Sequence, residues 1–218
     1  MKQALIFDLD GTLVDSLQGI ATALNRALSS SCLPTHPLEA VRGFIGNGAR
    51  VLIGRGVPAG SPETLIDAVE QAFKAEYEVA WPGGTIPYPG TARLLEKLQQ
   101  RGLALAVLSN KPHAFTVAMV ARIFPSIRFG AVLGQRAGIP HKPDPGGALE
   151  VSAQLEVPPE RCLVIGDSTM DIETAKNAQM KAIAVTWGFH DRERLVAAGA
   201  DYIADDPAQL LQILEATC

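Results

Sequence analysis

Two carboxylates stand two residues apart at the end of an apolar run near the start of the chain. Residues 4–7 (Ala-Leu-Ile-Phe) have the character of a buried strand, and Asp8 and Asp10 follow, with Gly11 after them. Alternate residues of a strand point the same way, so a strand over 4–9 would project both carboxylates from its carboxyl end, where open α/β sheets bind ligands. Like charges this close predict a hard cation such as Mg²⁺, and an ordinary polar turn is the alternative.

A second apolar run also ends in acidic residues. Residues 162–165 read as a strand that breaks into Gly166 and Asp167, and Asp171 lies four residues further on. A helix beginning there would hold Asp171 one turn in, so that it can converge with Asp167. Asp167 also suits a helix N-cap, a role that is compatible with metal binding.

Residues 103–108 form a third apolar run, which ends in Ser109, Asn110 and Lys111. A hydroxyl and the backbone N–H groups at the start of a following helix suit a phosphate oxygen. An ordinary serine cap explains the same residues, so this run taken alone leaves both interpretations open.

The fourth candidate for a functional site is a lysine in a loop that prolines make rigid. Lys142 precedes Pro143, and Asp144 and Pro145 suit the cap and first position of a helix. A lone lysine is usually a solvated surface charge. The prolines restrict the loop and therefore limit where Lys142 can point, which favours a binding role.

Apolar runs and helical patterns alternate through most of the chain. Strands are expected over 4–9, 103–108, 131–133, 162–165 and 182–185, with a short extra one at 202–203. Helices are expected over 91–100, 115–123, 147–155, 172–179, 192–198 and 208–215. This alternation predicts an α/β fold, a Rossmann-like parallel sheet core with helices on both faces.

The alternation stops between the first and second strands. Only helical patterns occur there, over 17–28, 38–44, 50–55 and 63–81, and no run resembles a core strand. We therefore expect an all-helical cap domain over 15–87, inserted into a core domain of residues 1–14 and 88–218 and lying over the strand ends. Candidate hinges are Asp15-Ser16 and residues 83–87.

Composition excludes several classes of function. With 47% hydrophobic residues among 218, the chain can bury a sizeable core, and a net charge of −4 argues against nucleic-acid or anionic-membrane binding. Cys32, Cys162 and Cys218 have no metal-binding spacing. No signal peptide or membrane-length apolar run occurs, so we expect a cytoplasmic location. We also expect a monomer or a homodimer.

The four strand-end motifs resemble, in order, those of the haloacid dehalogenase superfamily of Mg²⁺-dependent phosphatases. They are residues 8–12 (Asp-Leu-Asp-Gly-Thr), Ser109-Asn110, Lys142-Pro143, and residues 166–171 (Gly-Asp-Ser-Thr-Met-Asp). Residues 46–52, 87–90 and 107–112 resemble more narrowly the phosphoglycolate phosphatase branch.

The resemblance implies a two-step phosphoryl transfer. Asp8 would attack phosphorus, and Asp10 would protonate the leaving group and then deprotonate water. Mg²⁺ would be held by Asp8, the backbone carbonyl of Asp10, and Asp167. The resemblance also implies contacts with the phosphoryl group or the substrate for four residues: Ser109, Lys142, Thr12 and Asn110. Two further residues would lie behind the metal ligands without binding the metal themselves: Asp171 and Ser168.

The resemblance further implies that the partner is a small phosphorylated metabolite, with 2-phosphoglycolate as the first candidate. Its carboxylate needs a cation, for which Arg50 is the first hypothesis and Arg42 the second. Two alternatives stay open within the superfamily: a sugar phosphomutase of the β-phosphoglucomutase type, and a phosphatase for sugar phosphates or nucleotides. A catalytically silent regulator that binds a phosphorylated ligand is the alternative outside enzymes.

Overall fold

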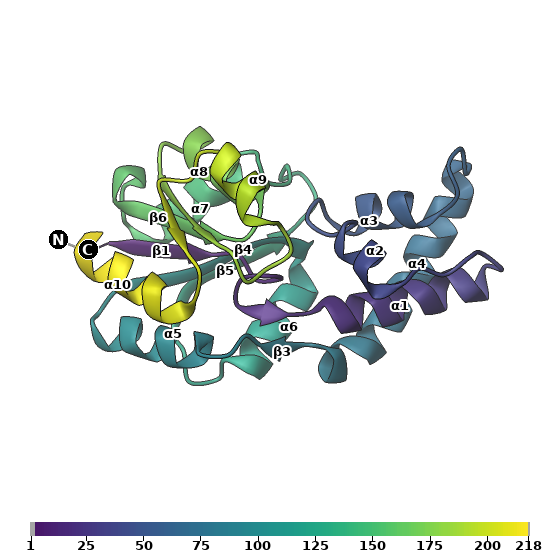
Figure 1. Ribbon diagram of the computed structural model, residues 1–218, viewed down its shortest axis with the longest axis horizontal. Helices are drawn as coiled ribbons and strands as arrows, with labels where there is room; N and C mark the ends of the chain where they lie inside the picture. The colour runs from purple at the N-terminus through teal and green to yellow at the C-terminus, as the bar shows by residue number, and fades with distance from the viewer. Residues whose placement is uncertain (1–2, 218) are drawn as a thin grey trace. The chain divides into compact units, whose positions relative to one another are not determined.

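The computed structural model describes residues 3–217, and Cys218 lies outside them. The chain divides into two compact units (Figure 1). One unit contains the residues up to Val14 and those from Pro87 onward, and the other contains Asp15–Ile86. No helix within residues 3–217 is long and apolar enough to cross a membrane.

A six-stranded sheet forms the centre of the first unit, and every neighbouring pair in it is parallel. The strand order is β5-β4-β1-β6-β7-β8, so the first strand lies in the middle of the sheet. The predicted α/β fold with a parallel sheet is confirmed. The strands are β1 (Ala4–Phe7), β4 (Ala104–Pro112), β5 (Phe129–Gln135), β6 (Cys162–Gly166), β7 (Lys181–Val185) and β8 (Tyr202–Ala204).

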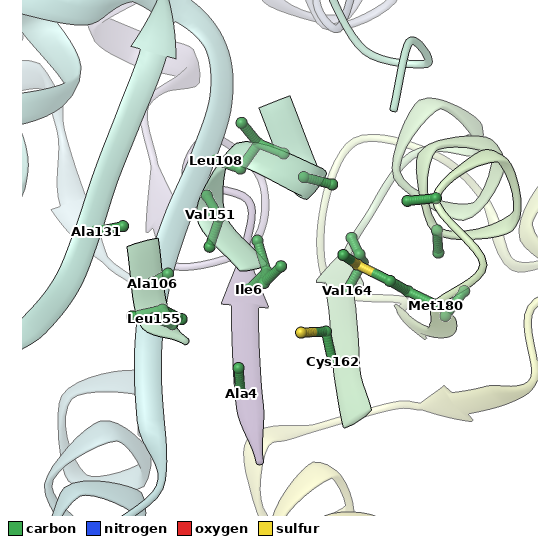
Figure 2. Packing of buried hydrophobic residues seen from close by; sticks show 14 of the residues in the cluster. Ala4, Ile6, Ala106, Leu108, Ala131, Val151, Leu155, Cys162, Val164 and Met180 are labelled. Atoms are coloured by element: carbon green, nitrogen blue, oxygen red, sulfur yellow. The ribbon is translucent and has the colours of Figure 1, made fainter. Parts of the chain in front are cut away.

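The central strands β1 and β6 are buried on both faces, which explains why they read as continuous apolar runs. Ala4 and Ile6 of β1 belong to one core cluster together with Ala106 and Val164 of the neighbouring strands (Figure 2). Leu5 and Phe7 point to the opposite face by the alternation of a strand, and they are fully buried as well.

Helices cover both faces of the sheet (Figure 1). The helices α7, α8 and α9 supply residues to the core cluster of Figure 2, whereas α5, α6 and α10 belong to the opposite face. Their bounds are α5 (Thr91–Gln100), α6 (His113–Ile123), α7 (Gly146–Leu155), α8 (Thr169–Asn177), α9 (Arg192–Ala197) and α10 (Pro207–Thr217), with a short 3₁₀ helix at Pro159–Arg161.

The second unit is built from helices, as the sequence predicted. They are α1 (Leu17–Ser30), α2 (Leu38–Arg42), α3 (Ala49–Gly56) and α4 (Glu63–Gly84), and α1 packs along α4. In α1 the buried residues Ile20, Leu24, Ala27 and Leu28 recur at helical spacing and form one apolar stripe. Two short strands, β2 (Val14–Asp15) and β3 (Ile86–Pro87), pair where the chain passes between the units. Two residues each are too few to give a strand pattern.

Two strand boundaries differ from expectation and change the surroundings of the motifs. The strand β1 ends at Phe7 instead of Leu9, because the chain turns at once and the Val14 N–H donates to the Leu9 carbonyl at 3.0 Å. The strand β4 continues through Pro112, beyond the predicted end at 108. Its register against β5 shifts between Leu108 and Pro112, so Ser109, Asn110 and Lys111 occupy a bulge within the strand.

Candidate active site

The carboxyl ends of the three central strands bring the motifs together. β1 lies between β4 and β6, and the Asp8 N–H donates to the Ile165 carbonyl of β6 at 2.8 Å. Asp8 therefore leaves β1 directly beside the end of β6, where Asp167 follows. Parallel strands expose their carboxyl ends at one edge, which explains why motifs distant in sequence meet here.

Asp8, Asp167 and Asp171 form an acidic cluster. Each offers a carboxylate oxygen, and these oxygens all lie within 4.8 Å of one another. Asp167 and Asp171 are 1% and 2% exposed. Three carboxylates held this closely away from water make a set of oxygen donors that fits a metal ion.

Both Asp167 oxygens are fixed by donors from separate loops. The Thr12 hydroxyl donates to Oδ1 at 2.9 Å, and the Phe189 N–H donates to Oδ2 at 2.8 Å. Gly11 has φ +87°, and a Cβ there would lie 2.2 Å from Asp167 Oδ2. Only glycine fits this position, because it tolerates the left-handed backbone and lets the loop approach Asp167.

Burial and mutual repulsion raise the pKa values of carboxylates in this cluster. Burial, followed by the charges of Asp8 and Asp171, raises the pKa of Asp167 to about 8. Burial likewise raises the pKa of Asp8 to about 6, with Asp171 and Asp10 adding to the effect and Lys142 opposing it. Carboxylates whose pKa is raised in this way are common at functional sites, where a bound ligand or cation compensates their charge.

Lys142 is the cation within the cluster. Its Nζ lies 3.0 Å from Asp8 Oδ1 and 2.5 Å from Asp171 Oδ1, and it donates to the Leu108 carbonyl at 3.1 Å. Burial alone would lower the pKa of Lys142, but the two carboxylates outweigh that effect and raise it. The residue is 6% exposed, so it is not the solvated surface charge that a lone lysine usually is.

Asn110 holds the backbone of Lys142 in place. The Lys142 N–H donates to Asn110 Oδ1 at 2.8 Å, and Asn110 Nδ2 donates to the Lys142 carbonyl at 3.2 Å. This reciprocal pair ties the bulge of β4 to the loop before α7. The structure thus gives Asn110 a positioning contact, and its predicted contact with substrate stays a prediction.

Asp171 and Ser168 form a capping box at the start of α8. Asp171 Oδ2 accepts from the Ser168 N–H at 3.1 Å and from its hydroxyl at 2.6 Å. Asp171 Oδ1 contacts Lys142 at the same time. Ser168, rather than Asp167, is the N-cap residue, so the carboxylate of Asp167 does not serve as a helix cap.

Ser109 is 5% exposed at the bulge of β4. Its Oγ accepts from the Lys111 N–H at 3.3 Å. A hydroxyl that accepts one hydrogen bond can still donate its own proton, so Ser109 is suited to a phosphate oxygen.

The sequence interpretation assigned no role to Lys111, yet this residue contacts Asp10. Its Nζ lies 2.9 Å from Asp10 Oδ1 and 2.7 Å from Oδ2. Asp8 and Asp10 are therefore bound by different lysines. The place of Lys111 two residues after Ser109 was the available signal, but the bulge that aims its side chain is not visible in the sequence.

Arg42 and Arg50 belong to the second unit. The Arg50 guanidinium forms ion pairs with Asp67 at 2.5 Å, with Glu70 at 3.2 Å and with Glu63. Arg42 lies 3.9 Å from Glu39. A substrate carboxylate at Arg50 would compete with three carboxylates of α4.

Full ionisation of the site would leave an excess of negative charge. The site contains four aspartates and two lysines. Asp8, Asp10 and Asp171 are paired with these lysines (Lys111 and Lys142), whereas Asp167 accepts from Thr12 and Phe189 instead. With all six ionised, the excess is two negative charges, since 4 − 2 = 2. A divalent cation would offset this excess, and carboxylate oxygens are the donors that Mg²⁺ prefers.

The chain is similar in sequence to known proteins. Residues 5–185 match the family of haloacid dehalogenase-like hydrolases. The chain is 32% identical to a phosphoglycolate phosphatase of Pseudomonas putida, over 97% of this chain and 79% of that protein. It is 35% identical to a phosphoglycolate phosphatase of Rhodospirillum rubrum, over 96% and 90%.

A solved structure agrees over nearly the whole chain. A crystal structure from Lactobacillus delbrueckii subsp. bulgaricus, provisionally named a phosphoglycolate phosphatase, superposes with a TM-score of 0.92 at 33% identity. The match covers 98% of this chain and 99% of that one. The chain therefore belongs to the haloacid dehalogenase-like hydrolases, in the branch whose relatives are named phosphoglycolate phosphatases.

Proposed function

We propose that this phosphatase is Mg²⁺-dependent and hydrolyses a small phosphate monoester, 2-phosphoglycolate first among them, through an aspartyl phosphate on Asp8. The observation that carries the proposal is the position of Asp8, which shares Lys142 with Asp171 and lies within the acidic cluster. The relatives named phosphoglycolate phosphatases support the choice of substrate.

In the first step a carboxylate oxygen of Asp8 forms a bond to phosphorus while the ester P–O bond breaks. Asp10 donates its proton to the departing alkoxide. Lys142, 3.0 Å from Asp8, reduces the repulsion between the carboxylate and the incoming phosphate, and Ser109 donates its hydroxyl proton to a phosphoryl oxygen. Thr12 contributes by holding Asp167.

In the second step water attacks the aspartyl phosphate. Asp10 takes a proton from the water, a new P–O bond forms, and the bond between Asp8 and phosphorus breaks to release inorganic phosphate. The same side chain thus acts first as an acid, in its protonated form, and then as a base, as the carboxylate, so its position has to serve both steps.

Asp8, Asp167 and the backbone carbonyl of Asp10 would hold the metal ion. Asp171 belongs to the same acidic cluster, but its two oxygens already contact Lys142 and Ser168, so we assign it to positioning Lys142 and α8. A bound Mg²⁺ supplies positive charge that stabilises the transferring phosphoryl group.

Removal of the metal should abolish activity. We expect no phosphate release from p-nitrophenyl phosphate in EDTA, full recovery with excess Mg²⁺, and inhibition by high Ca²⁺, whose longer bonds and looser geometry suit the reaction poorly. Asp167→Ala should raise the Mg²⁺ concentration needed for half-maximal activity, whereas Asp191→Asn, which also removes an aspartate charge but at the exposed cap of α9, should not. Full activity in EDTA, with no metal recovered from the protein, would remove the metal from the mechanism.

A substrate panel tests the identity of the ester and the role of Arg50 together. A bidentate contact between arginine and carboxylate is poorly replaced by lysine, so Arg50→Lys should raise KM for 2-phosphoglycolate far more than for p-nitrophenyl phosphate. Arg26→Lys is the control, because Arg26 also pairs with a carboxylate of α4, that of Glu76, at 3.4 Å.

Three other results of the panel have distinct meanings. Equal losses on both esters would limit Arg50 to its ion pairs within the second unit, and Arg42 would be tested next. A clear preference of the unmodified protein for hexose phosphates or nucleotides would contradict the choice of 2-phosphoglycolate. Absence of turnover on every ester would favour the phospho-ligand-binding regulator.

A further inference from the structure

Lys111 and Asp10 form a nearly buried ion pair that the reaction steps above leave unexplained. The side chain of Lys111 is 5% exposed and that of Asp10 is 12% exposed. Taking a lysine and a carboxylate out of water is costly unless the two contact each other closely. Both Asp10 oxygens lie within hydrogen-bond distance of Nζ, so the contact restricts the orientation of the carboxylate as well as its position.

The backbone of Lys111 is fixed on both sides. Its N–H donates to Ser109 Oγ at 3.3 Å, and its carbonyl accepts from the Thr116 hydroxyl at 3.2 Å. Residues 109–111 of β4 lie opposite Gly134 of β5, between the pairs Leu108–Leu133 and Pro112–Gln135. A Cβ at Gly134 would lie 2.6 Å from the Lys111 carbonyl oxygen, so any side chain at 134 would push the bulge out of place.

The two lysines have separate partners. Lys142 contacts Asp8 and Asp171, and Lys111 contacts Asp10. The proposed nucleophile and the proposed acid/base are therefore held by cations from different segments. Lys142 restricts Asp8 and Lys111 restricts Asp10, so two like charges on a short loop are kept in two defined positions.

We propose that Lys111 is a positioning residue that fixes the Asp10 side chain for both proton transfers, with one oxygen accepting from Nζ while the other carries the proton in the first step. This inference rests on the proposed function, in which one carboxylate must reach the leaving oxygen in the first step and the attacking water in the second. A misplacement of about 1 Å costs on the order of 100-fold in rate, so loss of the contact that fixes this side chain should lower the rate measurably.

The test compares Lys111→Met, Lys111→Arg, Asp10→Asn and the double variant Asp10→Asn/Lys111→Met. Lys97→Met, at an exposed position of α5, is the matched control. For each protein, kcat and kcat/KM are measured on an alkyl phosphate and on p-nitrophenyl phosphate. Nitrophenolate leaves without a proton, whereas an alkoxide needs one, so the two esters differ in their demand on Asp10 during the first step.

We expect Lys111→Met to lower kcat/KM for the alkyl phosphate by about 10- to 100-fold, with a smaller loss on p-nitrophenyl phosphate. KM should change little, and Lys111→Arg should recover part of the loss. In the Asp10→Asn background, Lys111→Met should have almost no further effect, because a residue that acts through Asp10 has nothing left to position. Lys97→Met should match the unmodified protein.

Three results would overturn the inference. Losses that multiply in the double variant would mean that Lys111 acts on the phosphate itself. Equal losses on the two esters without recovery by arginine would reduce Lys111 to a structural role, and unchanged activity of Lys111→Met would exclude any role. Where Lys111→Met does not fold, Lys111→Gln, which keeps a donor without the charge, takes its place in each comparison.

Failure of the proposed function would look different. If the unmodified protein released no phosphate, or if Asp8→Asn were fully active, the phosphatase mechanism itself would be wrong. In that case the contact between Lys111 and Asp10 would have no reaction to serve.

Discussion

Asp8→Asn should abolish phosphate release while the protein still folds. The amide has nearly the shape of the carboxylate but is a poor nucleophile, so no phosphoryl group can be accepted. Lys142 keeps its contact with Asp171 at 2.5 Å, and the acidic cluster loses one charge. The measurement is phosphate release from 2-phosphoglycolate and p-nitrophenyl phosphate, with mass spectrometry of the acid-quenched enzyme to detect phosphate on Asp8 in the unmodified protein.

The same substitution should make the metal-free protein more stable at pH 8. The pKa of Asp8 is raised to about 6 from 3.8, chiefly by burial, so the folded state disfavours its charged form. A carboxylate with a raised pKa in the folded state weakens the fold as pH rises from about 4 through 6, and the amide removes this cost. Melting temperatures in EDTA should therefore rise for Asp8→Asn at pH 8 and change little near pH 4.

Asp191→Asn is the control for both measurements, because asparagine caps a helix about as well as aspartate does. Its activity and melting temperature should match those of the unmodified protein. Retained turnover by Asp8→Asn, with mass spectrometry excluding deamidation, would contradict the covalent mechanism.

The sequence carried enough information to place most of the fold. Parallel strands buried on both faces must be apolar throughout, so β1 and β6 stood out as runs that end in aspartates. The helix α5 was predicted with the bounds that the structure has, because its buried leucines recur at helical spacing. The strand ends then brought Asp8 and Asp167 together, since neighbouring parallel strands share one edge.

The contacts that position these carboxylates were harder to predict from the sequence. The Phe189 N–H that donates to Asp167 is a backbone group in the loop after β7, and any residue type except proline could supply it. Lys111 reaches Asp10 only because β4 bulges against β5, and register shifts leave no pattern in one strand's sequence.

The ion pairs of Arg50 show a further reason why some contacts could not be predicted from the sequence. Glu63, Asp67 and Glu70 stand at helical spacing along α4, so their shared face could be recognised from the sequence. Which arginine packs against that face depends on how α3 and α4 meet, and that is a property of tertiary packing.

Lys142→Met should combine a loss of activity with a loss of stability. Methionine fills a similar volume but leaves Asp8 and Asp171 without their shared cation, and the Leu108 carbonyl loses a donor. Removing one partner from a buried ion pair costs about 3–5 kcal/mol, because the remaining charge is left uncompensated. Denaturant unfolding at pH 8 in EDTA measures this cost.

The stability loss should shrink when the carboxylates are relieved of charge. Lys142→Met in an Asp8→Asn background removes one of the two carboxylates that the lysine compensates, so the double variant should be more stable than Lys142→Met alone. Activity should not return, because the nucleophile is absent.

Lys181→Met, at an exposed position of β7, supplies the control for a lysine lost elsewhere in the same sheet. If Lys142→Met unfolded at the same denaturant concentration as the unmodified protein, the ion pairs of Lys142 would contribute nothing to the fold. If it also kept its turnover, the assignment of Lys142 to the phosphoryl group would be wrong.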